Sequence, residues 1–453
     1  MLATNWGEAE ILNVSASSRR MERRYRMDDK DGTGKMALGR RDFFKAAGVG
    51  LTAAGVVLSA QEEAQAQQVQ AANEKFNMER IAANTYGTRD LFKRRGSGRG
   101  NSGAQRTTTQ RPSNLVPPEV SNNPNAAEAI AWAKEAAAAR EKLPSPTEYK
   151  VKHGTLTILD YPQFVKDTFP GVTHLDMSSW FFGDPDDESM WFPAGSRIGG
   201  FNPGSAFDPQ SPSGRKWLDK LVSSCVKTGM KVQHITNDSP IDLAAFGSPE
   251  KDRARLAGVA IGKRWIEAFS KAGVGMKSMR MNSPSSLGGP IRPQAVPHGP
   301  GDGYPRDIDI VPQLAAAIES YKEMADFGGN YNVRVTMENH WGLAADPMMI
   351  RTIMDEVNHP FCEASPDMGN WEQHYMQFSG LKALAPYAHT NVHAKYWDRW
   401  NTNDIQRSTR IMLAHGYTGT FAAEYERGPW EQIEGCRYVM KEVLAALAMP
   451  TVA

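Results

Sequence analysis

The sequence has little cysteine, no excess of one charge, and no hydrophobic run long enough to cross a membrane. Its 453 residues include three cysteines, none in a CxxC pair, which excludes a small disulfide-stapled scaffold. The 52 basic and 51 acidic residues give a net charge of +1, which argues against nucleic acid or an anionic membrane as partner. The apolar run 46–60 is too short and too rich in Ala and Gly to span a bilayer. What remains is a large globular protein, whose 40 glycines and 28 prolines indicate many turns.

The first 66 residues carry the pattern of an export signal. The pair Arg40-Arg41, two phenylalanines and Lys45 precede the apolar run 46–60, and an Ala-Gln-Ala site ends at Ala66. A charged region, a hydrophobic region and an A-x-A site in this order are typical of a cleaved signal, and the arginine pair resembles a twin-arginine signal. We therefore expect a twin-arginine signal region over 1–66, cleavage near Ala66, and export by the twin-arginine machinery to the periplasm or the medium. A buried helix with a basic start is the alternative.

Residues 67–146 predict a polar linker. The segment 93–111, KRRGSGRGNSGAQRTTTQR, is poor in hydrophobic side chains and rich in Gly, Ser, Thr and Arg, a composition that predicts disorder. Only the stretch 125–142, rich in Ala and Glu, favours a helix, and two prolines follow it. The N-terminal extension is therefore expected to be largely disordered, with one helix near its end.

From residue 147 to 453, short apolar runs alternate with amphipathic helical patterns, which predicts a parallel sheet with helical crossovers. The eight predicted strands are 148–152, 173–178, 231–236, 276–281, 333–338, 362–367, 389–393 and 420–424. Eight such units in about 300 residues predict an α/β fold, a (β/α)₈ TIM barrel. The competing fold, a doubly wound open sheet, lacks the expected GxGxxG motif after any strand.

Each of the last four predicted strands ends in a residue able to bind a metal ion: Glu338, Asp367, His393 and Glu424. Their spacings of 29, 26 and 31 residues each match one β/α unit, so the four side chains lie at the same end of consecutive strands. Three carboxylates and one imidazole suit Mn²⁺ first, or Mg²⁺, and can accept Co²⁺ or Zn²⁺.

Several segments of residues 150–447 resemble the xylose-isomerase-like family of sugar isomerases and epimerases: MENHWG, PDMGNW, LAPYAHTNVHAKYWD and FAAEYE. The resemblance implies that the four residues above are the metal ligands, and that Glu338 and Glu424 are also the acid/base pair. Some epimerases carry a substrate-contacting histidine three residues after the aspartate, where this chain has Asn370. Arg399, six residues past the histidine ligand, matches an arginine of the family.

Further polar and aromatic side chains near the strand ends are predicted to bind substrate. The long Gly- and Pro-rich connections 182–213 and 283–305 predict lids on the catalytic face. Seven of the eleven tryptophans lie near strand ends, where their rings can meet the C–H faces of a sugar. The candidates are His234, Arg280, Asn282, His340, Lys395, Arg399, Trp180 and Trp397. Glu426 and Arg427, by contrast, predict a structural ion pair.

The expected function is an exported, divalent-metal-dependent sugar isomerase or epimerase that acts through a cis-enediolate. Because phosphorylated sugars are chiefly cytoplasmic, export favours a non-phosphorylated sugar or keto-sugar as substrate. Two alternatives stay open: a lyase or dehydratase acting on an oxidised sugar or glycoside, and a non-catalytic carbohydrate-binding barrel. The family also includes three-zinc endonucleases, but Asn370 and the near-zero net charge argue against that activity. Because family members often associate, a homo-oligomer is a further expectation.

Overall fold

The computed structural model describes residues 75–94, 126–193, 206–237, 243–244, 247–281, 310–340, 342–371, 375–398 and 403–449. All of them belong to one compact unit, Val69–Ala453. The predicted signal region, most of the segment 93–111 and the predicted lid 283–305 lie outside the described residues. So do the candidate residues Asn282 and Arg399.

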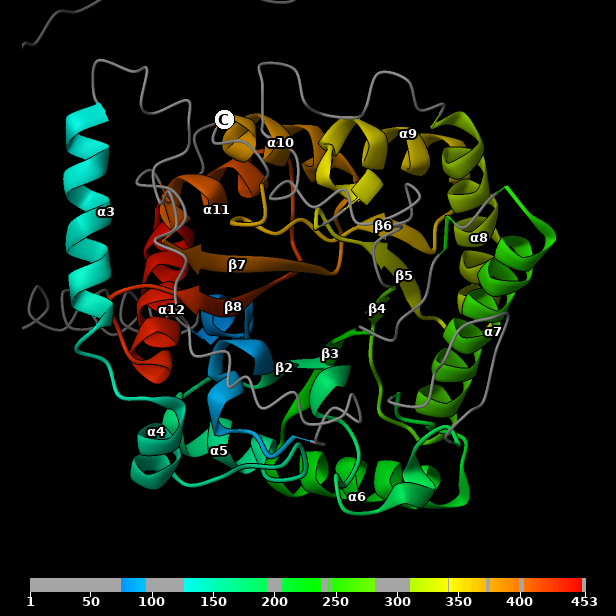
Figure 1. Cartoon of the computed structure of the whole chain (residues 1–453), viewed down its shortest axis with the longest axis horizontal. Helices are drawn as coiled ribbons and strands as arrows, with labels where there is room; N and C mark the ends of the chain where they lie inside the picture. The colour runs from blue at the N-terminus through cyan, green and yellow to red at the C-terminus, as the bar shows by residue number, and fades with distance from the viewer. Residues whose placement is uncertain are drawn as a thin grey trace, which may run out of the picture. The chain divides into compact units, whose positions relative to one another are not determined.

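Eight parallel strands form the centre of this unit (Figure 1). They are β1 (Ile81–Asn84), β2 (His174–Ser178), β3 (Lys231–Thr236), β4 (Ser278–Arg280), β5 (Arg334–Met337), β6 (Cys362–Ala364), β7 (Asn391–Trp397) and β8 (Thr420–Arg427). Their order is β6-β5-β4-β3-β2-β1-β8-β7. The two outer strands meet just past β6, where the N–H of His393 donates to the carbonyl of Pro366 and the N–H of Met368 donates to that of His393, both at 3.0 Å. The sheet thus closes, and the predicted (β/α)₈ barrel is confirmed.

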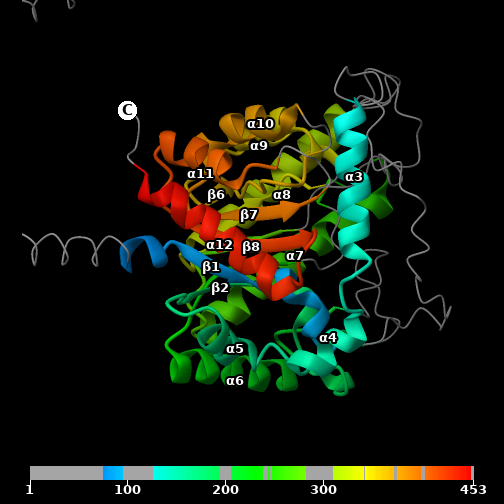
Figure 2. The same ribbon diagram turned by 90° about the vertical axis from the view of Figure 1, so that its left-hand side faces the viewer.

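At least one α-helix follows each strand and packs outside the sheet; Figure 2 shows α12 lying against β8. The helices are α5 (Tyr161–Thr168), α6 (Pro212–Thr228), α7 (Pro249–Lys271), α8 (Val311–Gly329), α9 (Pro347–Val357), α10 (Met376–Leu384), α11 (Ile405–Ala414) and α12 (Gln432–Ala448). Three of them begin with a side chain that accepts a backbone N–H, followed by a proline: Ser211, Ser248 and Asp346. These caps fix where the chain turns from loop to helix. Among the described helices, none has the length and apolar character that a membrane span requires.

The predicted first strand, 148–152, is wrong. That segment lies in the helix α4 (Pro146–His153), where Ser145 and Glu148 form a capping box. The first strand is instead Ile81–Asn84, inside the segment predicted to be a polar linker, and it pairs with both β2 and β8. The barrel therefore begins near residue 81 rather than at 147. The predicted helix at 125–142 is confirmed as α3 (Ala126–Arg140), so α3 and α4 both belong to the long connection between β1 and α5.

The helical layer leaves no room beside one glycine. A Cβ atom on Gly380 of α10 would lie 2.2 Å from the ring of Trp371, which is fully buried. Gly380→Ala is therefore expected to lower the free energy of unfolding by about 1–3 kcal/mol, because the indole must shift. Urea unfolding followed by circular dichroism measures this. The exposed neighbour Ser379→Ala should stay within about 0.5 kcal/mol of wild type, and equal stability of the two variants would contradict the tight contact.

Candidate active site

The four predicted metal ligands come together at the carboxyl ends of the last four strands. Glu338 directly follows β5, Asp367 lies three residues past β6, His393 lies in β7, and Glu424 lies in β8. None is more than 5% exposed. Because parallel strands of a barrel end on the same face, sequence spacing alone was enough to predict this convergence.

The Nδ1 atom of His393 faces three carboxylate oxygens. It lies 3.4 Å from Oε1 of Glu338, 3.7 Å from Oδ2 of Asp367 and 3.5 Å from Oε2 of Glu424. Both His393 Nδ1 and Asp367 Oδ2 are buried without a hydrogen-bond partner. A buried polar atom without a partner costs about 1–3 kcal/mol, and a divalent cation would satisfy both atoms at once. The donor set of Glu338, Asp367 and His393, whose ligand atoms lie within 4.8 Å of one another, therefore fits a metal ion.

The Asp367 carboxylate is oriented by the backbone. Its Oδ1 accepts the N–H groups of Gly369 at 2.6 Å and of Asn370 at 3.0 Å. The Asn339 side chain clamps the same residue, since its Oδ1 accepts the N–H of Asp367 and its Nδ2 donates to the carbonyl. With Oδ1 held in this way, Oδ2 is the oxygen that points toward His393.

Two buried cations partly balance the carboxylates. Arg280, at the end of β4, forms an ion pair with Oε2 of Glu338. Nζ of Lys395, in β7, lies 2.9 Å from Oε1 of Glu424 and 3.2 Å from Oε2 of Glu426. Asn370 joins both halves, because its Nδ2 donates to Glu338 Oε1 at 2.8 Å and its Oδ1 accepts from Lys395 at 2.9 Å. Asn370, at the position where some epimerases carry a histidine, thus orients Glu338 and Lys395 in this protein.

The pKa values reflect this crowding of charge. Burial alone would raise the pKa of Glu338, but Arg280 and His393 hold it well below its ordinary value. Burial raises the pKa of Glu424 to about 7, against the opposing effects of Lys395 and His393. Burial raises the pKa of Asp367 as well. For His393, burial acts to lower the pKa, but Glu338 and Asp176 raise it well above its ordinary value. Four carboxylates (Glu338, Asp367, Glu424 and Glu426) thus face two cations, Arg280 and Lys395, and this excess of negative charge suits a cation site.

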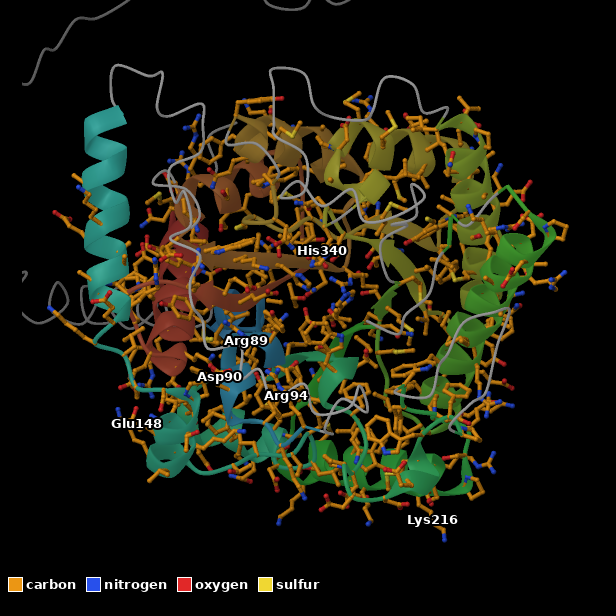
Figure 3. All side chains as sticks on the ribbon, in the orientation of Figure 1. Arg89, Asp90, Arg94, Glu148, Lys216 and His340 are labelled. Carbon is orange, nitrogen blue, oxygen red and sulfur yellow. The ribbon has the colours of Figure 1, made fainter. Side chains whose placement is uncertain are left out.

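A cavity of about 180 Å³ opens above these residues. Its wall consists of Asn84, Tyr86, Ser178, Trp180, Thr236, Arg280, Glu338, His340, Asn370, His393, Lys395, Trp397, Glu424 and Glu426. Figure 3 shows His340 near the centre of the ring of strands; burial lowers the pKa of its imidazole to about 3, so it is neutral at ordinary pH. A larger cavity of about 470 Å³ lies at the starts of β2, β3 and β4, but none of the described residues lining it is a carboxylate.

Of the predicted substrate contacts that the structure describes, five line the cavity: Arg280, His340, Lys395, Trp180 and Trp397. Trp180 is 54% exposed, and its ring meets that of Tyr86 edge-on with 6.0 Å between centroids. His234 does not line the cavity; it is fully buried behind the site, and its Nδ1 lies 2.7 Å from the hydroxyl of Ser278. His234 was predicted to contact substrate, but the structure places it deeper in the barrel, against the ring of His393.

Other expectations are corrected by the packing. Glu426 and Arg427 contact different partners, since Glu426 faces Lys395 in the cavity wall and Arg427 donates to Asp398 at 2.9 Å. Trp191 and Trp371, two of the seven tryptophans counted near strand ends, are buried in packing contacts.

Among the residues of the site that sequence reasoning missed are Asn84, Tyr86 and Asp176. The first two belong to β1 and the turn after it, which was not recognised as part of the barrel. Asp176 carried a signal that could have been used, namely an acid between two apolar residues of a strand, Leu175 and Met177.

Residues 200–442 match the family model described as xylose isomerase-like TIM barrel. A search of curated proteins finds no match.

Solved structures with a similar fold include a xylose isomerase-like TIM barrel protein from Mycobacterium smegmatis in complex with magnesium. It is 14% identical, with a TM-score of 0.41, over 64% of this chain and 89% of that one. A 3-keto-D-glucoside 4-epimerase from E. coli is 12% identical, with a TM-score of 0.42, over 63% of this chain and 94% of that one. An L-ribulose 3-epimerase is 12% identical, with a TM-score of 0.42, over 64% and 89%. Because the family model spans more than half of the sequence, this chain belongs to the xylose isomerase-like TIM barrel family.

Proposed function

We propose that this protein is a divalent-metal-dependent sugar isomerase or epimerase that acts on a non-phosphorylated sugar or keto-sugar. The observation that carries the proposal is the meeting of Glu338 and Glu424 with His393 Nδ1 in the wall of one cavity. Glu338, Asp367, His393 and Glu424 would hold the cation, with Mn²⁺ as the first choice and Mg²⁺, Co²⁺ or Zn²⁺ as alternatives. When bound, such an ion would polarise the carbonyl of the substrate and the adjacent hydroxyl.

The two glutamates would move the proton. One carboxylate removes the proton from the carbon next to the carbonyl, which leaves a cis-enediolate, and the other returns a proton to the neighbouring carbon or to the opposite face. Return to the neighbouring carbon is isomerisation, and return to the opposite face is epimerisation. Asn370 and Arg280 fix the orientation of Glu338, and Asn84 donates to Oε2 of Glu424 at 3.3 Å.

The aromatic and basic residues of the wall would bind the sugar. Trp180 and Trp397 offer ring faces to its C–H groups. Lys395, held as an ammonium by Glu424 and Glu426, offers a positive charge to the oxygen on which negative charge develops.

We also propose that the protein is exported through the twin-arginine route and cleaved near Ala66. The order of Arg40-Arg41, the apolar run 46–60 and the Ala-Gln-Ala site supports this proposal. Export of an already folded chain would allow the cation to be loaded in the cytoplasm, before the site meets competing ions outside. N-terminal sequencing of protein recovered from the periplasm or medium is expected to start just after Ala66; a mature chain that retains Arg40 would contradict cleavage.

The proposed activity is tested by metal analysis combined with solvent deuterium. The purified protein is expected to contain about one divalent ion per chain and, in D₂O, to place deuterium in a rearranged product from at least one of a panel of keto-sugars. Removal of the ion by a chelator should stop the exchange, and Mn²⁺ should restore it. Exchange with loss of a substituent would identify a lyase instead. Binding of both metal and sugar without any exchange would contradict every enzymatic function and favour a binding protein.

A further inference from the structure

Asp176 of β2 contacts the candidate metal ligand His393 from the side opposite the carboxylates. Its side chain is fully buried, and its Oδ2 lies 2.9 Å from Nε2 of His393. It is not one of the residues that form the wall of the 180 Å³ cavity, so it does not meet a substrate there. Its direct contact with the candidate site is through the histidine.

The contact determines which nitrogen of His393 carries a proton. An ionised carboxylate can only accept a hydrogen bond, so Nε2 is the donor. In the neutral form, the form that binds a metal, the ring then presents a lone pair at Nδ1, the atom that faces Glu338, Asp367 and Glu424. The opposite tautomer would direct an N–H at the position where a cation binds.

We propose that Asp176 is a positioning residue that fixes both the tautomer and the orientation of the His393 ring, so that Nδ1 is ready to bind a divalent cation. The inference rests on the proposed metal-dependent function. It adds a fifth barrel residue to the four ligands, one that comes from a strand on which no ligand lies.

The surroundings of Asp176 hold it in this geometry. Nδ2 of Asn391 donates to the same Oδ2 at 2.8 Å, and Oδ1 of Asn391 in turn accepts from the hydroxyl of Thr420 at 2.9 Å. Thr236 donates to Oδ1 of Asp176 at 3.4 Å. The His393 ring is also packed edge-on against His234, with 5.9 Å between centroids and an interplanar angle of 78°. Contacts from β3 and β7 therefore hold the Asp176 carboxylate directly, and Thr420 of β8 orients the Asn391 side chain that bonds to it.

The test is the affinity of the full chain for Mn²⁺, measured by isothermal titration calorimetry after the metal has been stripped with a chelator. Asp176→Asn keeps the size of the side chain but offers a donor where only an acceptor stood. It is expected to weaken Mn²⁺ binding by about 10–100-fold. The matched control is Glu363→Gln, the same chemical change at another buried barrel carboxylate, which contacts Thr390 and Arg334 rather than the site. The control should bind Mn²⁺ as wild type does.

A second measurement separates positioning from a general loss of structure. In the Mg²⁺-loaded protein, which is diamagnetic, the ¹⁵N shifts of the His393 ring should show Nε2 protonated in wild type and altered protonation in Asp176→Asn. If Asp176→Asn does not fold, Asn391→Ala takes its place and should weaken Mn²⁺ binding in the same direction.

The outcomes are distinguishable. Wild-type affinity in the folded Asp176→Asn variant, or in Asn391→Ala where the former does not fold, overturns the positioning role while the proposed function stands. A wild-type protein that binds no divalent ion overturns the proposed function and this inference with it. An equal loss of affinity in Glu363→Gln also overturns the inference, because the effect would then belong to any buried carboxylate of the barrel.

Discussion

Glu338→Gln is expected to lower the rate of solvent-deuterium exchange into a keto-sugar by about 10²–10⁴-fold, the usual contribution of a general base. The substitution keeps the size of the side chain and its contact with Asn370, but an amide cannot take up the proton. The ion pair with Arg280 is lost at the same time. The expected result is therefore a protein that binds sugar and cannot exchange its proton.

The measurement must separate loss of the base from loss of the metal. Metal content and the exchange rate are determined on the same sample at saturating Mn²⁺, and circular dichroism confirms that the fold persists. Glu363→Gln again serves as the control, since it makes the same change in a buried carboxylate away from the cavity. Exchange at the wild-type rate in metal-loaded Glu338→Gln would refute the role of Glu338 as base, leaving its role as ligand intact.

The metal ligands and Lys395 were predictable because their positions follow from the local pattern of strands and helices. The four ligands recur once per β/α unit, either within a strand or just after it, and the closure of the barrel brings these positions together without further information. Lys395 was found for the same reason, because it lies two residues past His393 and therefore on the same side of β7.

What escaped prediction depends on contacts between distant parts of the chain. The strand β1 is four residues long, and its identity comes from pairing with β8, about 340 residues later. Asn84 meets Glu424 across the same separation. Whether a tryptophan ring faces the cavity or the core likewise depends on the residues that pack against it. Trp371 is an example, because its ring fills the space beside Gly380. No local pattern contains that information.

Loss of Lys395 is expected to destabilise the fold strongly. Its side chain is 4% exposed and lies within reach of the buried carboxylate of Glu424, the half-buried carboxylate of Glu426 and the Asn370 oxygen. Removing one member of a buried ion pair leaves its partners charged without compensation, which costs about 3–5 kcal/mol. Lys395→Met preserves much of the apolar stem but removes the charge. It is expected to lower the free energy of unfolding of the metal-free protein by that amount, as measured by urea unfolding at pH 8.

The pH dependence of the free energy of unfolding shows whether the lost charge of Lys395 causes the destabilisation. The folded pKa of Glu424 is already raised to about 7, so ionisation of this carboxyl disfavours the folded state, and the penalty is fully present only above that pH. Without the ammonium of Lys395 the pKa must rise further, so the loss in Lys395→Met should be larger at pH 8 than at pH 5, where Glu424 is protonated. Added Mn²⁺ should recover part of the loss, since the cation supplies positive charge to the same carboxylates.

The control Lys271→Met, at an exposed lysine paired with Glu267, should leave the free energy of unfolding unchanged at both pH values. A loss in Lys395→Met that is independent of both pH and Mn²⁺ would show that the lysine acts through the packing of its stem rather than through its charge.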